Sequence, residues 1–145
     1  MGRILALDLG SKTIGIALSD ETGTFVFPGR TLPRHEGWRR DVRALADLAQ
    51  REGVSEIVVG HPVHMDGSRG VQAERAEEFA EHLRRRVRLP VHLQDERLST
   101  WEAGERLAEA GRSRRDPNID SAAAAVILQS FLDRRGLGTR ARECA

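Results

Sequence analysis

The chain has 145 residues, 39% of them hydrophobic, and its 23 basic and 22 acidic side chains leave a formal net charge of +1. This length supports one hydrophobic core but not two substantial domains. The charge balance argues against a protein that binds nucleic acid by bulk positive charge alone, although a local basic patch remains compatible with it. A single cysteine, Cys144, excludes a disulfide framework and a cysteine-based zinc site.

The N-terminal segment and the cysteine content also bear on location. The apolar run that follows Arg3 is too short to span a membrane, and no signal-peptide cleavage site follows it. A lone cysteine fits a reducing cytosol. We therefore expect a soluble, cytoplasmic protein with no membrane partner.

Three short runs rich in β-forming residues open the chain. Ile4–Leu9 and Ile14–Ser19 are separated by a short glycine-containing turn, which is typical of an antiparallel hairpin. The run Thr24–Pro28 extends this meander. Arg39–Glu52 then has apolar residues at helical spacing, and Gly53 is expected to end that helix.

The middle of the chain alternates strands with helices. Glu56–Gly60 is a continuous apolar run that suits a central strand covered on both faces. Val71–Arg86 has a helical pattern, and Val91–Gln94 predicts a further strand. Thr100–Glu109 is expected to be helical, and Gly111–Asn118 to be a polar, basic loop.

The last apolar stretch predicts a helix that begins at Asp120 or Ser121 and continues to about Leu132. The remaining residues show no periodicity, so we expect a flexible C-terminal tail over residues 133–145. Strands that come first as a meander and then alternate with helices imply a mixed sheet covered on both faces. The sequence therefore predicts one α/β domain over residues 1–132.

Three acidic positions stand where α/β sheets place functional groups. Asp8 lies near the end of the first strand, before a glycine, and Asp120 opens the last helix. Glu96, with its neighbour Asp95, follows a later strand. Such strand ends and helix N-termini converge at one edge of the sheet. If the carboxylates meet there, they form a hard oxygen site suited to Mg²⁺ or Mn²⁺, and two such ions about 4 Å apart promote phosphodiester hydrolysis.

Each acid also has a purely structural explanation, and the residues alone do not decide between it and a functional role. Asp8 has the position of a solvated turn residue. Asp120 has the position of a helix N-cap, which is worth about 1 kcal/mol. Asp95 and Glu96 could be surface charges paired with Arg97.

Four stretches of the sequence together resemble one known family. In chain order they are LDLGSKTIGIALSD, VVGHPVHMDGS, QDERLST and IDSAAAAVILQSFL. They are similar to the YqgF (RuvX) family, a group of small bacterial proteins related to Holliday-junction resolvases of the RuvC type and assigned as pre-16S rRNA maturation nucleases. The resemblance extends from the N-terminus to about Leu132, and the combination of the four stretches is highly specific.

The resemblance implies an RNase H-like fold, with a mixed five-stranded sheet and helices on both faces, and a metal-dependent acidic site that holds Mg²⁺ or Mn²⁺, with two ions expected. Asp8, Glu96 and Asp120 match the catalytic, metal-binding acids of such nucleases. Asp95 is adjacent to Glu96 and could take its role. Because strand alternation puts the two side chains on opposite faces, only one of them points at the metal, and the family pattern favours Glu96.

The resemblance also suggests residues that contact nucleic acid or brace the acids. The arginines of GRSRRDP are expected to grip phosphates, since arginine forks match phosphate oxygens, although a solvated charge run explains them equally well. Relatives usually carry leucine and asparagine where this chain has His61 and His64, which could bind a metal or phosphate or be tolerated substitutions. The nucleic-acid-binding candidates are Lys12, Thr13, Arg97, Thr100, Arg112, Arg114 and Arg115, with Ser19 and Asp20 as further candidate site residues.

The function implied is hydrolysis of phosphodiester bonds, with the 5′ end of precursor 16S rRNA as the substrate most in line with the family. Structured DNA, including Holliday junctions, and single-stranded DNA are alternatives that offer the same bond. A non-catalytic RNA-binding factor in ribosome assembly is a third alternative. An ATP-binding protein is a fourth, since DLGSKTIGIALSD also looks like the first phosphate loop of actin-like kinases, but no second phosphate loop follows. The sequence leaves open whether the protein is a monomer or a homodimer.

Overall fold

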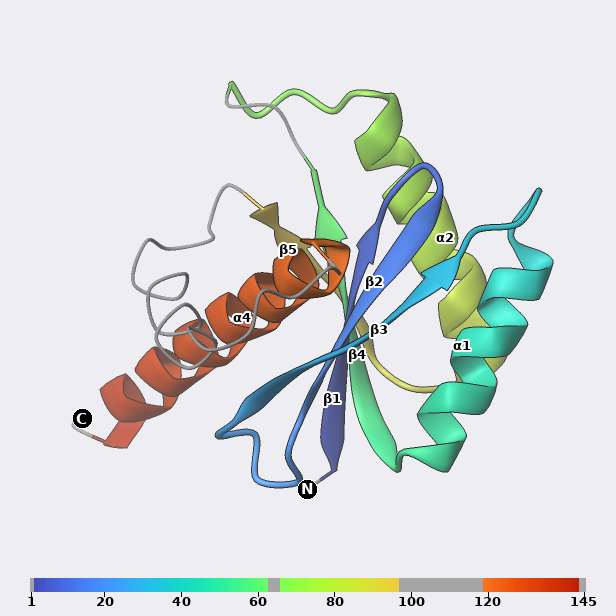
Figure 1. Ribbon diagram of the computed structural model, residues 1–145. Coiled ribbons are helices and arrows are strands. Elements are labelled where there is room, and N and C mark those ends of the chain that lie inside the picture. The colour runs from blue at the N-terminus through green and yellow to red at the C-terminus, as the bar shows by residue number, and fades with distance from the viewer. Residues whose placement is uncertain (1, 63–65, 97–118, 144–145) are drawn as a thin grey trace.

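The computed structural model describes residues 2–62, 66–96 and 119–143, and these form five strands and three helices (Figure 1). The predicted helix at Thr100–Glu109 and the predicted loop at Gly111–Asn118 lie outside the described residues. The elements are β1 (Arg3–Leu9), β2 (Thr13–Ser19), β3 (Val26–Pro33), α1 (Arg39–Arg51), β4 (Val54–His61), α2 (Val71–Val87), β5 (Val91–Asp95) and α4 (Ile119–Glu143).

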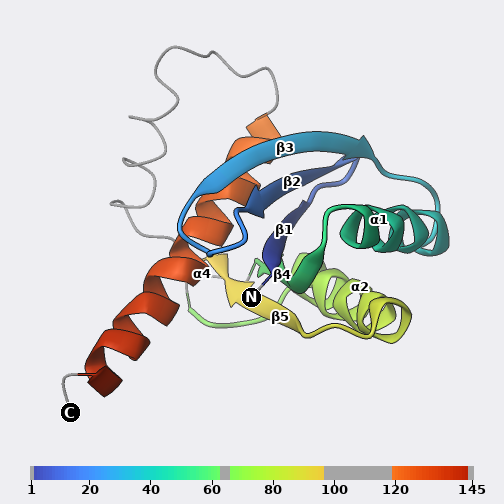
Figure 2. The same ribbon diagram turned by 90° about the horizontal axis from the view of Figure 1, so that it is seen from below.

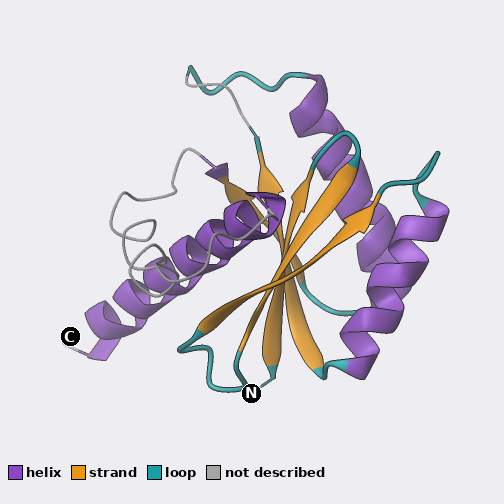
Figure 3. Cartoon of the chain, in the orientation of Figure 1, coloured by secondary structure: helices purple, strands orange, loops and turns teal. Residues whose placement is uncertain are grey.

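The five strands form one mixed sheet in the order β3-β2-β1-β4-β5. β2 pairs antiparallel with β1 and with β3, whereas β4 pairs parallel with β1 and with β5. Helices α1 and α2 cover one face, and α4 crosses the other (Figures 2 and 3). The predicted α/β fold with a mixed five-stranded sheet and helices on both faces is confirmed. Because β1, β4 and β5 are parallel, their C-terminal ends lie at the same edge of the sheet.

Alternate residues of the strands pack into two separate cores, one on each face. Leu5 and Leu7 of β1 are fully buried in the core beneath α1 and α2. Ile4 and Ala6 are buried in the core beneath α4. Since side chains alternate along a strand, Asp8 is the next residue on the α4 face.

The third strand is displaced from its predicted position. Prediction placed it at Thr24–Pro28, whereas β3 spans Val26–Pro33. It begins later because the Asp20 carboxylate accepts hydrogen bonds from the backbone N–H groups of Thr24 and Phe25, at 2.8 and 3.0 Å, which holds these residues in the preceding turn. It continues past Pro28 because β3 is an edge strand, where a missing N–H donor is tolerated.

The last helix extends beyond its predicted bounds at both ends. It begins at Ile119, so Asp120 lies in its first turn, and it continues to Glu143. The glycines after Leu132 do not end it, because a glycine inside a helix costs only about 1 kcal/mol relative to alanine. Arg135 also ties this part of α4 to the sheet through two hydrogen bonds to Glu56, at 2.6 and 3.0 Å. Arg135 is thus attached to the sheet, and the domain boundary at residue 132 and the flexibility of the tail stay predictions.

Membrane insertion finds no support in the described helices. None of them is both long enough and apolar enough to cross a bilayer.

Ser19 joins the first two strands at the edge of the sheet where β1 begins. Its hydroxyl accepts a hydrogen bond from the backbone N–H of Ile4 at 2.8 Å and donates one to the carbonyl of Asp20 at 2.9 Å. The residue is only 1% exposed, so water cannot replace these bonds. This serine therefore satisfies a buried backbone donor.

Replacing this hydroxyl should destabilise the fold. We expect Ser19→Ala to lower the free energy of unfolding by about 1–3 kcal/mol, because the N–H of Ile4 stays buried without an acceptor. Urea unfolding followed by circular dichroism measures the change. The matched control is Ser55→Ala, since the Ser55 hydroxyl makes only a long 3.4 Å bond to the carbonyl of Arg3. Equal losses in the two variants would contradict the role given to Ser19.

Candidate active site

Two of the predicted acids meet at the edge of the sheet where β1, β4 and β5 end. Asp8 is near the end of β1, and Glu96 directly follows β5. The side chains lie close enough for Asp8 to act on Glu96 through its charge and through a hydrogen bond. Both line a cavity of about 240 Å³, whose other lining residues are Leu9, Gly10, Ser11, Gly60, Pro62, Gln72 and Ala76.

The environment of Glu96 disfavours its ionised form. Burial is the largest cause of the raised pKa of Glu96, and the charge of Asp8 and a hydrogen bond with Asp8 raise it further. The charge of Asp95 adds a smaller effect in the same direction, whereas His61 opposes the shift. The ionised forms of Asp8 and Glu96 therefore repel each other, and a cation placed beside them would offset this repulsion.

Gly60 provides the space that Glu96 occupies. A Cβ atom on Gly60 would lie 2.7 Å from Oε1 of Glu96 and 2.7 Å from Cδ1 of Ile127 in α4. Both distances are shorter than real contacts, so a larger residue would displace the carboxylate or the isoleucine. A glycine at the end of an otherwise apolar strand signals a close approach of this kind, and sequence analysis did not use that signal.

Strand alternation distinguishes Glu96 from Asp95. Asp95 is the last residue of β5 and pairs with His61 of β4. On β5, Val91 packs in the core beneath α1 and α2, so odd-numbered residues share that face. His92 lies against Phe131 of α4, which puts even-numbered residues on the face of Asp8. Of the two acids, the structure brings Glu96 and not Asp95 into the cavity with Asp8.

The third predicted acid is placed only by its backbone. Asp120 lies in the first turn of α4, which begins near the edge where β1, β4 and β5 end (Figure 1). Its side chain lies outside the described part of the structure. Among the described residues, no group of three acidic, histidine or cysteine side chains is arranged to hold a metal ion. Asp120 as a metal ligand therefore stays a prediction.

The candidate nucleic-acid contacts divide into two groups. Lys12 is exposed in the turn that follows the cavity-lining residues Gly10 and Ser11, and Thr13 begins β2 directly after it. The others lie outside the described residues, together with His64: Arg97, Thr100, Arg112, Arg114 and Arg115.

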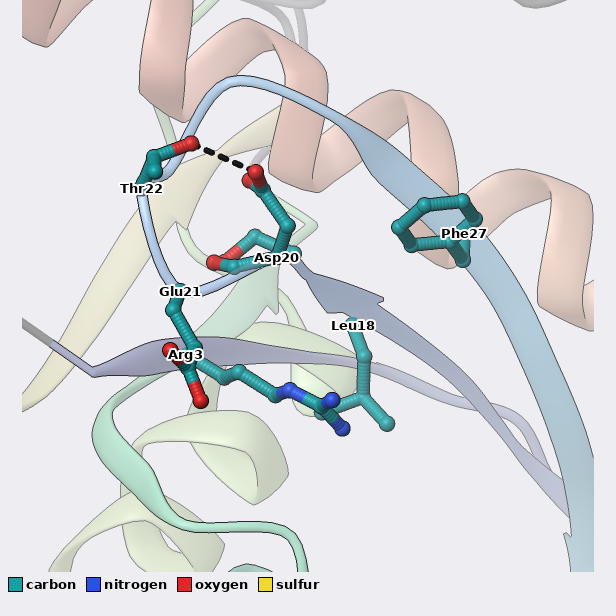
Figure 4. Close-up of a pocket in the computed structure, with 7 residues that line it drawn as sticks. Arg3, Leu18, Asp20, Glu21, Thr22 and Phe27 are labelled. Carbon is teal, nitrogen blue, oxygen red and sulfur yellow. Dashed lines mark hydrogen bonds between the residues drawn. The ribbon is translucent and has the colours of Figure 1, made fainter.

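Ser19 and Asp20 lie at the opposite end of the sheet from Asp8. They line a separate, wider cavity of about 520 Å³ together with Arg3 and Phe27 (Figure 4). A hydrogen bond from Thr22 and others from backbone N–H groups lower the pKa of Asp20 to about 2. The Asp20 carboxylate thus stabilises the turn in which Asp20 itself lies. The structure does not bring these two residues to the acidic pair.

Sequence analysis did not anticipate the partners of His61. Its Nε2 lies 3.2 Å from the Glu77 carboxylate of α2, and Nε of Arg69 donates to the same oxygen at 3.0 Å. These contacts tie the end of β4 to α2 beside the cavity. The sequence suggested a loop position for His61, but the residue is the last of β4, and its partner Glu77 lies sixteen residues away in the chain.

The mixed five-stranded sheet with helices on both faces is an RNase H-like fold. Among solved structures, RuvC of Thermus thermophilus bound to a Holliday-junction substrate matches with a TM-score of 0.72, covering 96% of this chain and 98% of that one at 12% identity. Another structure of the same RuvC matches with a TM-score of 0.62, covering 92% and 96% at 11% identity. At this identity the likeness establishes the fold.

Sequence comparison gives the family. The RuvX family, described as Holliday junction resolvase, matches residues 2–134, and the chain belongs to it. A relative from Moorella thermoacetica named "Putative pre-16S rRNA nuclease" is 51% identical over 136 residues, which cover 92% of this chain and 96% of its own. A relative of the same name from Caldanaerobacter subterraneus is 42% identical over 134 residues, covering 90% and 96%. The protein is thus a nuclease of the class that hydrolyses phosphodiester bonds.

The raised pKa of Glu96 predicts that ionised Glu96 lowers the stability of the folded protein. The folded state holds the Glu96 proton more tightly than the unfolded chain, so stability falls as pH rises from 4.5, the ordinary value, through the raised pKa. We expect Glu96→Gln to raise the melting temperature at pH 7 in the presence of a chelator, and to lose this gain below about pH 4. Scanning calorimetry at both pH values measures it.

The control for this experiment is Glu78→Gln, which changes an exposed acid of α2 in the same way. It should leave the melting temperature unchanged at either pH. A glutamine at position 96 that lowers stability at pH 7 would show that ionised Glu96 is favourably paired, contrary to the geometry described.

Proposed function

We propose that this protein is a nuclease dependent on divalent metal ions that processes the 5′ end of precursor 16S rRNA. The observation that carries the proposal is the meeting of Asp8 and Glu96 in one cavity at the edge of the sheet. The relatives named for this substrate support the choice of RNA, since their similarity covers nearly the whole chain.

The residues of the site fit Mg²⁺ or Mn²⁺. Asp8 and Glu96 present carboxylate oxygens, which these hard cations prefer. Burial and then the charge of Asp8 raise the pKa of Glu96, and a divalent cation would offset the repulsion between the two carboxylates. The absence of a side chain at Gly60 preserves the space in which the Glu96 carboxylate sits. Asp8 and Glu96 would therefore hold the metal.

Asp120 is proposed as the third ligand from its place in the helix. It precedes Ala124 and Ile127 of α4 by four and seven residues, a spacing that returns to the same side of a helix. Ala124 and Ile127 are both buried against the sheet, and Ile127 lies beside Gly60. This spacing supports the proposal that Asp120 joins Asp8 and Glu96 as the third ligand.

The reaction proposed is hydrolysis of a phosphodiester to a 5′-phosphate and a 3′-hydroxyl. Bound divalent ions supply activation of water and neutralisation of the charge that develops on the phosphate. Asp8 and Glu96 would bind and orient these ions. Lys12, exposed next to the cavity-lining residue Ser11, would provide a positive charge for the phosphate backbone of the substrate.

The substrate is recognised mainly through its backbone and shape. The chain has no tyrosine, two tryptophans and four phenylalanines, which leaves little capacity for base stacking. Binding through phosphates weakens steeply with salt. A protein that processes precursor rRNA works where ribosomes are assembled, so the proposal places this one in the cytoplasm. A single catalytic centre suffices for trimming rRNA, and a monomer would be competent.

A second candidate substrate is four-way junction DNA. The description of the matching family as Holliday junction resolvase favours it. Resolving a junction requires two symmetric cuts, so this activity needs a homodimer. The oligomeric state in solution therefore bears on the choice between the two substrates.

Loss of the first acid should abolish the reaction. We expect Asp8→Asn to keep the fold and to reduce cleavage in Mn²⁺ by at least about 100-fold, as removal of a group that stabilises the transition state does. A gel assay on labelled RNA measures the rate, and excess EDTA should abolish wild-type cleavage. The control Asp47→Asn neutralises an exposed acid of α1 and should cut at the wild-type rate. Wild-type activity in Asp8→Asn would refute the assignment.

A panel of substrates distinguishes the candidates. We expect an RNA spanning the 5′ end of 16S rRNA to be cut at least about tenfold faster, by kcat/KM, than a four-way DNA junction or single-stranded DNA of equal length. Initial rates on all three, at matched salt, measure this preference. Junction cleavage that dominates, together with a dimeric mass in solution, would favour the resolvase. Inactivity on every substrate in Mg²⁺ and Mn²⁺, with retained RNA binding, would favour a non-catalytic assembly factor.

A further inference from the structure

The turn between β1 and β2 is held by hydrogen bonds from within and from Arg34 outside it. Gly10, Ser11 and Lys12 form this turn, which the Gly10 N–H closes by donating to the carbonyl of Thr13 at 2.9 Å. Gly10 and Ser11 line the cavity that contains Asp8 and Glu96. These small or exposed residues bury little surface of their own, so the turn depends on hydrogen bonds to its backbone for a fixed position.

Arg34 provides two of those hydrogen bonds. Its Nη1 donates to the carbonyl of Gly10 at 3.0 Å, and its backbone N–H donates to the carbonyl of Lys12 at 2.9 Å. The strand register brings Arg34 close to the turn, because Pro33 pairs with Thr13 and places Arg34 opposite Lys12 at the end of the hairpin. Arg34 therefore donates hydrogen bonds to both ends of the turn that borders the cavity.

The guanidinium group is itself fixed from the other side. Asp41, in the first turn of α1, places Oδ2 3.7 Å from Nε of Arg34, and the side chain of Asp41 is only 2% exposed. The guanidinium carbon also lies 5.7 Å from the centre of the Phe79 ring of α2. His35 completes the arrangement, since its Nδ1 lies 2.9 Å from Oδ1 of Asp41. Arg34 thus links both helices of this face to the turn.

We propose that Arg34 is a positioning residue of the nuclease: by holding the Gly10–Lys12 turn beside Asp8, it sets the place where Lys12 meets the substrate backbone. The expected kinetic effect rests on the proposed function. The hydrogen bonds by which Arg34 holds the turn are a property of the fold and do not depend on that function. The turn contacts the substrate in the ground state and the transition state alike, so its displacement weakens binding without slowing the chemical step.

The hold on the turn is tested without any activity. We expect Arg34→Ala to speed hydrogen exchange of the Gly10 N–H at least about tenfold, because the turn that this N–H closes loses the charge-assisted hydrogen bond to its Gly10 carbonyl. Arg34→Lys keeps the charge but lacks the separate Nε and Nη1 groups that face Asp41 and Gly10, so its exchange rate should lie between wild type and alanine. The matched control is Arg30→Ala, which removes an exposed arginine of β3, the strand that Arg34 follows, and should leave the exchange rate unchanged.

The kinetic consequence is tested on the RNA that wild type cleaves. Arg34→Ala should raise KM about tenfold with kcat within about threefold of wild type, whereas a merely structural loss of folded protein lowers kcat at constant KM. In a Lys12→Ala background the same substitution should raise KM by less than about threefold, because the contact it positions is already absent. Should Arg34→Ala fail to fold, Arg34→Lys carries the same test with smaller changes.

Two results overturn the inference. One is Gly10 exchange in both Arg34 variants that matches Arg30→Ala, and the other is a lower kcat at unchanged KM. Failure of the proposed function gives a different result, namely a wild-type protein that cleaves no substrate. In that case hydrogen exchange alone decides whether Arg34 holds the turn.

Discussion

The close approach of two carboxylates, Asp8 and Glu96, is the constraint around which the rest of the molecule is arranged. Partly buried like charges repel, and here burial and the neighbouring charge together raise the pKa of Glu96. A fold that only maximised stability would separate them. The surrounding sheet instead fixes them side by side, with a glycine at position 60 where a side chain would displace Glu96 or Ile127. Such stored repulsion is typical of a functional site that binds a cation.

The sheet holds Asp8 and Glu96 together because the packing and pairing of its central strands fix the positions of both residues. β1 lies between β2 and β4, and its apolar residues fill a core on each face. A shift of β1 by one residue would exchange the faces of all these side chains, so the register of Asp8 is fixed by packing. Parallel pairing of β4 with β1 and β5 then brings the ends of all three strands to one edge. The position of the acids thus follows from burial elsewhere in the strands.

Local patterns were sufficient to predict the class of fold. The hairpin and the helices that the structure places at Arg39–Arg51 and Val71–Val87 depend on patterns of a few residues, whereas the choice of Glu96 over Asp95 came from the family resemblance. The start and length of β3 were not predictable in this way, because they depend on which strand lies at the edge and on bonds from Asp20 to the following turn. The tie between Arg135 and Glu56, which extends the domain, joins positions 79 residues apart.

The same limit applies to the surroundings of the acids. The role of Gly60 follows from a contact with Glu96, and the bonds from Arg34 to Gly10 cross the hairpin over 24 residues. Neither of these two contacts produces a periodic pattern in the sequence. A glycine or an arginine in one linear stretch has many structural uses, and only the assembled sheet selects among them. Sequence patterns therefore identify the reacting groups better than the residues that hold them in place.

The two edges of the sheet differ in how well their polar groups are satisfied. At the edge where β1 begins, Ser19 and Asp20 have hydrogen-bond partners within the turn and the neighbouring strand. At the other edge, burial and the charge of Asp8 disfavour the ionised form of Glu96. The first edge therefore contributes satisfied hydrogen bonds to stability, whereas the second carries the acids proposed to bind metal. The packing of the central strands connects the two edges, so the stability of the rest of the fold can offset an unfavourable pair of acids at the second.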